Sequence, residues 1–210
     1  MSGTRRIRVV DTTLRDGSHS VSHQYTLEQI RDIAQALESS NIDTVEVTHG
    51  DGLGGSSIQY GRSKVSDREA IRAAGSLLRR SKLAVLLLPG IGVKEDLEMA
   101  RAEGARIARI ATHCTEADIS EQHMRMARDL GMETMGFLML SHMETPENLL
   151  EQARKMESYG AGVVYVVDSA GAMLPDEVKR KVGKLKEHLN IDIGFHAHNN
   201  LGLAIGNSLA

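Results

Sequence analysis

Seven short apolar runs, each followed by a longer amphipathic stretch, constrain the fold of this 210-residue chain more than any other feature of its sequence. The runs are rich in valine, isoleucine, leucine and alanine and are nearly continuous in apolar character, which is typical of parallel strands buried on both faces. The amphipathic stretches between them predict helices that cover those faces. The predicted strands are residues 6–11, 44–49, 82–89, 106–113, 133–140, 163–168 and 192–198.

The boundaries of the predicted helices are marked by capping residues. Thr26 with Gln29 and Ser66 with Glu69 have the spacing of capping boxes, in which a hydroxyl and a side chain three residues later satisfy free backbone N–H groups. Proline at a first helical turn and glycine just after a last turn mark further starts and stops. These positions are Pro146 after Thr145, Pro175 after Leu174, and the glycines Gly104, Gly131 and Gly160.

Seven strand–helix units in a row fit either a doubly wound sheet or a barrel. The glycine fingerprint of a dinucleotide-binding sheet is missing after the first run, and polar residues follow most of the strands, as expected when all strands end at one face of a barrel. We therefore predict an α/β protein with a (β/α)8 TIM barrel, formed by residues 1–210 as a single catalytic domain. A complete barrel needs an eighth strand and typically about 250 residues. We expect an incomplete barrel of about seven βα units, truncated before that strand, with exposed edges that favour association between copies.

Charge and composition argue against several kinds of partner. The chain has 25 Lys and Arg residues against 28 Asp and Glu residues, a net charge of −3, and no long basic block. This favours neither a nucleic-acid nor a membrane-surface partner. The start of the sequence lacks the apolar centre of a signal peptide, and the single cysteine, Cys114, allows no intramolecular disulfide. We expect a cytoplasmic protein.

A candidate metal site is formed by His196, His198 and Asp16. Two histidines two residues apart on a strand point to the same side, and Asp16 lies just beyond the first predicted strand. Two imidazoles and a carboxylate suit Mn²⁺, Fe²⁺, Co²⁺ or Zn²⁺, accept Mg²⁺, and leave positions where a 2-oxo acid binds. The alternatives are two histidines that only cap the strand and an Asp16 that forms a loop ion pair with Arg15.

Two neighbours of Asp16 have side chains that suit carbon–carbon bond chemistry. Arg15 beside a chelated keto oxygen would stabilise the negative charge of an enolate, and His19 could act as a general base on a substrate hydroxyl. A surface arginine and an ordinary loop histidine are the alternatives. Other polar residues at strand ends are predicted to line the pocket, mostly without touching the substrate. They are His49, Thr112, His113, Ser141, His142, Asp168 and Ser169.

The lysines argue against a Schiff-base aldolase, which needs a desolvated lysine at the carboxyl end of a barrel strand. Lys82 opens a strand at the opposite end, and Lys64 and Lys94 lie in a loop and at a helix start. The others are predicted to face solvent on helices: Lys155, Lys179, Lys181, Lys184 and Lys186. If the reaction breaks a carbon–carbon bond, a metal rather than an imine stabilises the carbanion.

A glycine-rich stretch, HGDGLGGSS at residues 49–57, follows the second predicted strand. It lacks the lysine and hydroxyl residue of a phosphate-binding loop. Two interpretations remain open, a mobile lid over the site or a long connection.

Six segments together carry a resemblance to one family. DTTLRDGSHS, VEVTHGDGLGGSS, IATHCTEAD, GFLMLSHM, VVDSAGAMLP and FHAHNNLGLA resemble the 4-hydroxy-2-oxovalerate aldolases of aromatic meta-cleavage degradation, over about residues 6–210. As a set these motifs are specific, whereas LRDG and HxHN alone indicate only the wider superfamily of metal-dependent barrels related to pyruvate carboxylase and isopropylmalate synthase.

The resemblance implies cleavage of 4-hydroxy-2-oxopentanoate to pyruvate and acetaldehyde with Mn²⁺ or a similar ion. It implies metal ligation by Asp16, His196 and His198, enolate stabilisation by Arg15, a base role for His19 and a contact of Ser169 with the pyruvate carboxylate. The family continues with an eighth strand and a helical C-terminal domain. That domain supplies a tyrosine near the active site and docks an acylating acetaldehyde dehydrogenase. We expect these 210 residues to stop before it.

Three other functions are alternatives. The first is an acyl-CoA-dependent enzyme, either of the homocitrate or isopropylmalate synthase type or of the hydroxymethylglutaryl-CoA lyase type, which would share the metal and the arginine. Such synthases, however, usually have the sequence RDGEQ where this chain has RDGSHS. A non-catalytic fragment that folds only with a completing partner is the second alternative. A zinc amidohydrolase is disfavoured, because its His-x-His pair comes from the first strand.

Overall fold

The computed structural model describes residues 7–210, so the start of the first predicted strand, Arg6, lies outside the described residues. The chain divides into two compact units, Met1–Ile107 and Ala108–Ala210. The described part of each unit alternates strands and helices in the predicted order.

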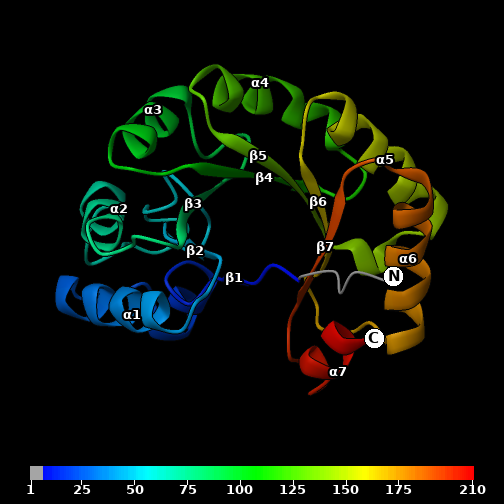
Figure 1. The fold of residues 1–210 in the computed structure, drawn as a ribbon, viewed down its shortest axis with the longest axis horizontal. Helices are drawn as coiled ribbons and strands as arrows, with labels where there is room; N and C mark the ends of the chain where they lie inside the picture. Colours follow the sequence, from blue (N-terminus) through cyan, green and yellow to red (C-terminus); the bar gives the residue numbers. More distant parts are fainter. Residues whose placement is uncertain (1–6) are drawn as a thin grey trace. The chain divides into compact units, whose positions relative to one another are not determined.

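The first unit contains three parallel strands in chain order, and Val10 aligns with Thr44, which in turn aligns with Lys82. Figure 1 shows its three α-helices following one another along one side of these strands. Val45 of β2, Ile71 of α2 and Leu87 of β3 are fully buried. The elements are β1 (Val10–Asp11), the 3₁₀ helix η1 (Asp16–Val21), α1 (Leu27–Ser39), β2 (Thr44–Glu46), α2 (Asp67–Gly75), β3 (Lys82–Leu87) and α3 (Lys94–Ala102).

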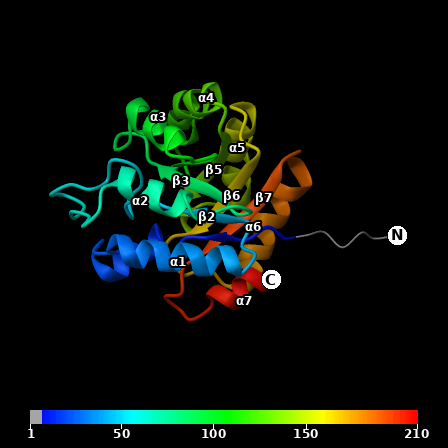
Figure 2. The ribbon, with the colours of Figure 1, turned by 60° about the vertical axis from the view of Figure 1, so that its left-hand side comes forward.

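The second unit repeats this arrangement. Strands β5, β6 and β7 are parallel neighbours, with Met135 aligned to Val163 and Val163 to Asp192. Helices α4, α5 and α6 follow one another along one side of them (Figure 1), and the short α7 packs on β7 (Figure 2). The elements are β4 (Ile107–His113, which starts at the last residue of the first unit), η2 (Ala117–Ser120), α4 (Glu121–Asp129), β5 (Glu133–Met139), η3 (Ser141–Met143), α5 (Pro146–Ser158), β6 (Val163–Asp168), α6 (Pro175–His188), β7 (Asp192–Ala197) and α7 (Ala204–Leu209).

The predicted helix boundaries are confirmed. Thr26 and Ser66 form complete capping boxes at the starts of α1 and α2, and Pro146 and Pro175 open α5 and α6. Gly104, Gly131 and Gly160 all have positive φ angles of 111°, 71° and 96°. Only a residue without a Cβ takes such angles without strain, which is why each glycine ends a helical segment.

The predicted fold class is confirmed. The seven strands follow one another in chain order, β2 to β6 are largely buried, and a helix follows each strand, which is the order of seven of the eight units of a (β/α)8 barrel of the TIM type. The first strand is shorter than predicted. None of the helices formed by residues 7–210 is long and apolar enough to cross a membrane.

One prediction about the lysines is wrong. Lys181 of α6 does not face solvent: its side chain is buried, and its Nζ donates hydrogen bonds to the carbonyl oxygens of Ser141 at 3.0 Å and His142 at 3.3 Å. Burial lowers the pKa of Lys181 from its ordinary value. The amphipathic pattern of α6 did not reveal this, because the partners are backbone atoms of η3, 39 and 40 residues earlier in the chain.

Candidate active site

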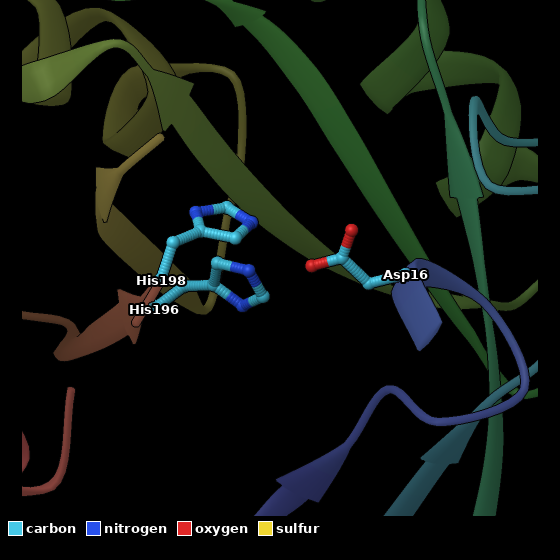
Figure 3. Close-up of side chains that lie close together, drawn as sticks. All are labelled: Asp16, His196 and His198. Atoms are coloured by element: carbon cyan, nitrogen blue, oxygen red, sulfur yellow. The ribbon is translucent and has the colours of Figure 1, made fainter. Parts of the chain in front are cut away.

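The two predicted histidine ligands lie at the end of β7. His196 and His198 leave the same side of the strand (Figure 3), with ring centroids 4.9 Å apart and both side chains half-buried. The alternation of side chains along an extended strand produces this arrangement, because residues two apart share a face. The geometry is therefore the one that the spacing predicted.

His198 is held by a backbone contact that fixes its tautomer. Its Nδ1 lies 2.8 Å from the carbonyl oxygen of Asp168, so Nδ1 carries the hydrogen and donates it. The lone pair is then on Nε2, which is the tautomer typical of metal-binding histidines. The contact fits both the ligand role and the alternative, in which the histidine caps the strand by pairing with a backbone carbonyl.

His196 packs against an aromatic cluster in the second unit. Its ring meets that of Phe137 edge to face at a centroid distance of 5.2 Å. The guanidinium carbon of buried Arg109 lies 4.5 Å from the ring centroids of both Phe137 and Tyr165. These stacked contacts restrict the rotation of the His196 ring.

A tight turn after β6 carries Asp168 and Ser169. The carboxylate of buried Asp168 accepts hydrogen bonds from the backbone N–H groups of Ala172 and Met173, both at 3.0 Å, which closes the turn. The Oγ of half-buried Ser169 accepts from the Leu140 N–H at 2.8 Å, so its own hydroxyl hydrogen is directed elsewhere. Asp168 thus orients His198 through its backbone, and its side chain supports the turn rather than binding a ligand.

Arg15 and Asp16 lie together at the start of η1 in the first unit. Arg15 is 5% exposed, so the alternative of a surface arginine is wrong. Its Nε donates to Oε2 of fully buried Glu46 at 2.6 Å, and its Nη1 lies 3.2 Å from Oδ1 of Asp16. Burial alone would lower the pKa of Arg15, but the charges of Glu46 and Asp16 raise it above its ordinary value. The alternative ion pair between Asp16 and Arg15 is thus present.

His19 lies on the exposed side of η1, at the end of a row of three histidines. The His23 ring meets the His19 ring edge to face at 4.8 Å and stacks on the His49 ring at 3.8 Å. Nδ1 of buried His49 accepts from the Asp51 N–H at 3.0 Å, so the hydrogen sits on Nε2, which donates to the Gly61 carbonyl at 3.1 Å. Burial lowers the pKa of both His23 and His49, which keeps these two rings neutral at pH 7.

The glycine-rich stretch lies close to two of these rings, those of His19 and His49. A Cβ on Gly50 would lie 2.4 Å from Nε2 of His19, and one on Gly55 would lie 2.5 Å from Nδ1 of His49. Only glycine permits so close an approach of backbone to ring.

The part of this connection up to residue 55 is firmly held. Leu53 is fully buried, and the carboxylate of Asp67 accepts hydrogen bonds from the N–H groups of His49 and Gly54. The connection between β2 and α2, cyan in Figure 2, extends away from both elements. The structure favours the interpretation of residues 49–55 as a fixed connection, so any lid is restricted to the residues beyond them.

Each unit thus carries half of the predicted site. Arg15, Asp16 and His19 lie in the first unit, and Ser169, His196 and His198 lie in the second. The assembly of Asp16 with the two histidines into one metal site stays a prediction.

Two contributors were missed in the sequence. Glu46, the partner of Arg15, could have been found in the sequence, because a carboxylate inside an apolar strand needs a buried cation as its partner. The Asp168 carbonyl could not have been found in the sequence, because every residue has a backbone carbonyl whatever its side chain is.

Solved structures show the same architecture. The carboxyl transferase domain of Rhizobium etli pyruvate carboxylase with pyruvate and biocytin has a TM-score of 0.82 and 19% identity, covering 97% of this chain and 37% of that one. At this identity the likeness establishes the fold, a TIM-type α/β barrel protein. The chain belongs to the HMGL-like family, whose model matches residues 6–210.

Curated relatives share much higher identity. A 4-hydroxy-2-oxovalerate aldolase from Thermomicrobium roseum is 62% identical over 203 residues, with 97% of this chain and 57% of that protein covered. One from Thermus thermophilus is also 62% identical over 203 residues, with 96% and 58% covered. The resemblance inferred from the motifs is therefore confirmed. The chain spans less than two thirds of the length of these relatives.

Proposed function

We propose that this chain carries the catalytic barrel of a metal-dependent aldolase that cleaves 4-hydroxy-2-oxopentanoate to pyruvate and acetaldehyde in aromatic meta-cleavage degradation. The observation that carries the proposal is the identity of 62% over 203 residues with relatives named 4-hydroxy-2-oxovalerate aldolase. The polar side chains of the two units support this chemistry.

Asp16, His196 and His198 would hold the divalent ion. Each offers one ligand atom and is half-buried, and the hydrogen bond from His198 Nδ1 to the Asp168 carbonyl leaves Nε2 suited to a metal. Mn²⁺ is our first choice, with Mg²⁺, Co²⁺ or Zn²⁺ as alternatives. When bound, the ion supplies a Lewis acid that polarises the keto oxygen of a 2-oxo acid.

Arg15 stabilises the charge that develops during cleavage. The bond between C3 and C4 breaks, and its electron pair moves toward the 2-oxo group to give the enolate of pyruvate. The guanidinium of Arg15 is pre-oriented by Glu46 at 2.6 Å and Asp16 at 3.2 Å, so its charge is available without reorganisation.

His19 and Ser169 complete the proposed machinery. His19 takes the proton of the 4-hydroxyl group as acetaldehyde forms, and its exposed ring on η1 is accessible for this transfer. The free hydroxyl hydrogen of Ser169 donates to the substrate carboxylate, because its oxygen already accepts from the Leu140 N–H. Protonation of the enolate at C3 then yields pyruvate.

A coupled assay tests the proposal. Pyruvate release from 4-hydroxy-2-oxopentanoate is followed with lactate dehydrogenase, with Mn²⁺ added to the purified chain, and acyl-CoA substrates are assayed beside it. We expect pyruvate only from the hydroxy-oxo acid. Turnover of an acyl-CoA substrate would instead support the synthase or lyase alternative, which no relative reported above favours. Metal binding without turnover of either substrate would support the non-catalytic fragment.

Two substitutions separate the proposed roles. Asp16→Asn replaces an anionic ligand by an amide and should weaken Mn²⁺ binding without unfolding the chain. Arg15→Ala should retain most of the Mn²⁺ affinity and slow pyruvate release by about 10²–10³-fold, the range measured for loss of one charge-stabilising donor. Equal losses of metal affinity in both variants would contradict the assignment of Arg15 to the enolate.

The remaining parts of the proposal concern the whole protein. We propose that both units form one barrel domain and that the protein acts in the cytoplasm. An acylating acetaldehyde dehydrogenase is the partner that would consume the aldehyde product. Association between copies of the chain is a further part of the proposal, for which gel filtration is the direct measurement.

A further inference from the structure

A second group of potential metal ligands lies in the first unit. The ligand atoms of His19, His23 and Asp51 all lie within 4.8 Å of one another. His19 belongs to η1, His23 follows that helix by two residues, and Asp51 follows β2 in the glycine-rich connection. Apart from the role of His19 as a base, none of these residues takes part in the proposed reaction.

The imidazole rings in this group are suited to binding a cation. Metal ions bind neutral imidazole, so a protonated ring is a poor ligand. The pKa of His23 is lowered by burial first and then by the charges of the neighbouring His49 and His19 rings. Packing at centroid distances of 3.8 and 4.8 Å thus disfavours protonation of the central ring.

Asp51 supplies a carboxylate without a strong partner. Within residues 7–210 its carboxylate forms no ion pair with a lysine or arginine, and the nearest basic nitrogen is His49 Nδ1 at 3.5 Å. That nitrogen already accepts the Asp51 backbone N–H at 3.0 Å, so it has no hydrogen to give to the carboxylate. The His19 ring likewise makes no hydrogen bond with any described residue.

The central ring is fixed before any ligand arrives. His23 Nδ1 lies 3.0 Å from Ser18 Oγ, and the Ser18 hydroxyl donates its own hydrogen to the Arg15 carbonyl oxygen at 2.6 Å, so Nδ1 carries a hydrogen and donates it to Ser18. A cation would bind the lone pair of Nε2, while the hydrogen bond from Nδ1 to Ser18 holds the ring in place. Gly50 and Gly61 leave room around the rings, because a Cβ at these positions would lie 2.4 Å from His19 and 3.1 Å from His23.

We propose that His19, His23 and Asp51 form a second divalent-metal site, distinct from the one assigned to Asp16, His196 and His198. Two imidazole nitrogens and one carboxylate oxygen are the same donor set as at the first site, so the second site suits first-row divalent ions, including Co²⁺ and Zn²⁺, with water in the remaining positions.

Occupation of this site has a consequence for catalysis. An ion bound to a ring nitrogen of His19 removes the base that takes the proton of the 4-hydroxyl group, so excess Zn²⁺ inhibits the reaction. This consequence rests on the proposed function, whereas the binding itself rests only on contacts within the first unit.

Titration of the purified chain with Co²⁺ tests the site, followed by calorimetry and by visible absorption. We expect two bound equivalents in the unchanged chain and one in Asp51→Asn and in His19→Asn. Both changes leave the fold intact, since Asn is nearly isosteric with Asp and His19 is exposed. The matched controls Asp129→Asn in α4 and His188→Asn in α6 alter exposed residues and should retain two equivalents.

The outcomes separate the two proposals. Both sites are supported if Asp16→Asn still binds one equivalent of Co²⁺ and the double variant Asp16→Asn/Asp51→Asn binds none. One equivalent in the unchanged chain that Asp51→Asn removes and Asp16→Asn retains supports the second site and contradicts the first. Two equivalents in Asp51→Asn, or one equivalent that only Asp16→Asn removes, would overturn the second site. No binding in the unchanged chain would overturn both.

Discussion

The buried ion pair between Arg15 and Glu46 leads to the sharpest prediction. Glu46→Gln removes the charge of a fully buried carboxylate whose Oε2 lies 2.6 Å from Arg15 Nε. Breaking a buried pair by removing one partner typically costs about 3–5 kcal/mol, because the other charge remains desolvated. Two features reduce this cost here: the glutamine oxygen still accepts from Nε, and Asp16 stays 3.2 Å from Nη1. We therefore expect a loss of about 2–3 kcal/mol in the free energy of unfolding.

Urea unfolding followed by far-UV circular dichroism measures this loss. The midpoint should fall without a change in the slope m, because the surface exposed on unfolding is the same. In thermal unfolding the same loss corresponds to a fall of roughly 4–12 °C for a chain of this size. Glu151→Gln, at an exposed position on α5, is the matched control and should change stability by less than about 0.5 kcal/mol. A similarly small change in Glu46→Gln would refute the reasoning, since Glu46 would then not be compensating a buried charge.

Two further predictions concern the first unit. Gly50→Ala places a Cβ 2.4 Å from His19 Nε2, and because the exposed ring can swing away, pyruvate release should fall at least about 10-fold with an unchanged circular dichroism spectrum. The control Gly183→Ala in α6, where an added Cβ meets no atom within 4 Å, should leave the rate unchanged. Burial alone would raise the pKa of Glu38, but hydrogen bonds from the backbone N–H groups of Arg80 and Ser81 lower it to about 2. Ionised Glu38 therefore stabilises the fold when the pH is above the ordinary pKa of a carboxyl group. This contribution is about 2–3 kcal/mol after allowance for screening, and it is lost as the pH falls toward 2. Urea midpoints measured from pH 7 to pH 3 should converge between Glu38→Gln and the unchanged chain, and parallel curves would contradict this account.

The fold could be predicted because its signals are local. A continuous apolar run, the hydroxyl of Thr26 three residues before Gln29, and the positive φ of Gly104 each depend on a few neighbouring residues. The position of a buried polar side chain depends instead on its partner. Glu46 and Lys181 find their partners 31 to 40 residues away, so neither contact could be placed from periodicity alone.

The candidate site shows the same division between local and distant information. The spacing of His196 and His198 fixes their common face, because strand geometry alone determines it. The tautomer of His198 is set by the Asp168 carbonyl 30 residues earlier, which only the structure reveals.

The glycines after β2 show why composition alone left two interpretations open. In the sequence, glycines in residues 49–57 suggest mobility, since glycine restricts the backbone least. In the structure, Gly50 and Gly55 lie where a Cβ would collide with the rings of His19 and His49. The absence of a side chain at these two positions is therefore required by packing. A glycine that would make a free loop more mobile here allows the backbone to lie against the histidine rings. Substitution by alanine separates the two interpretations, because it would merely stiffen a mobile lid but would displace a ring from a packed connection.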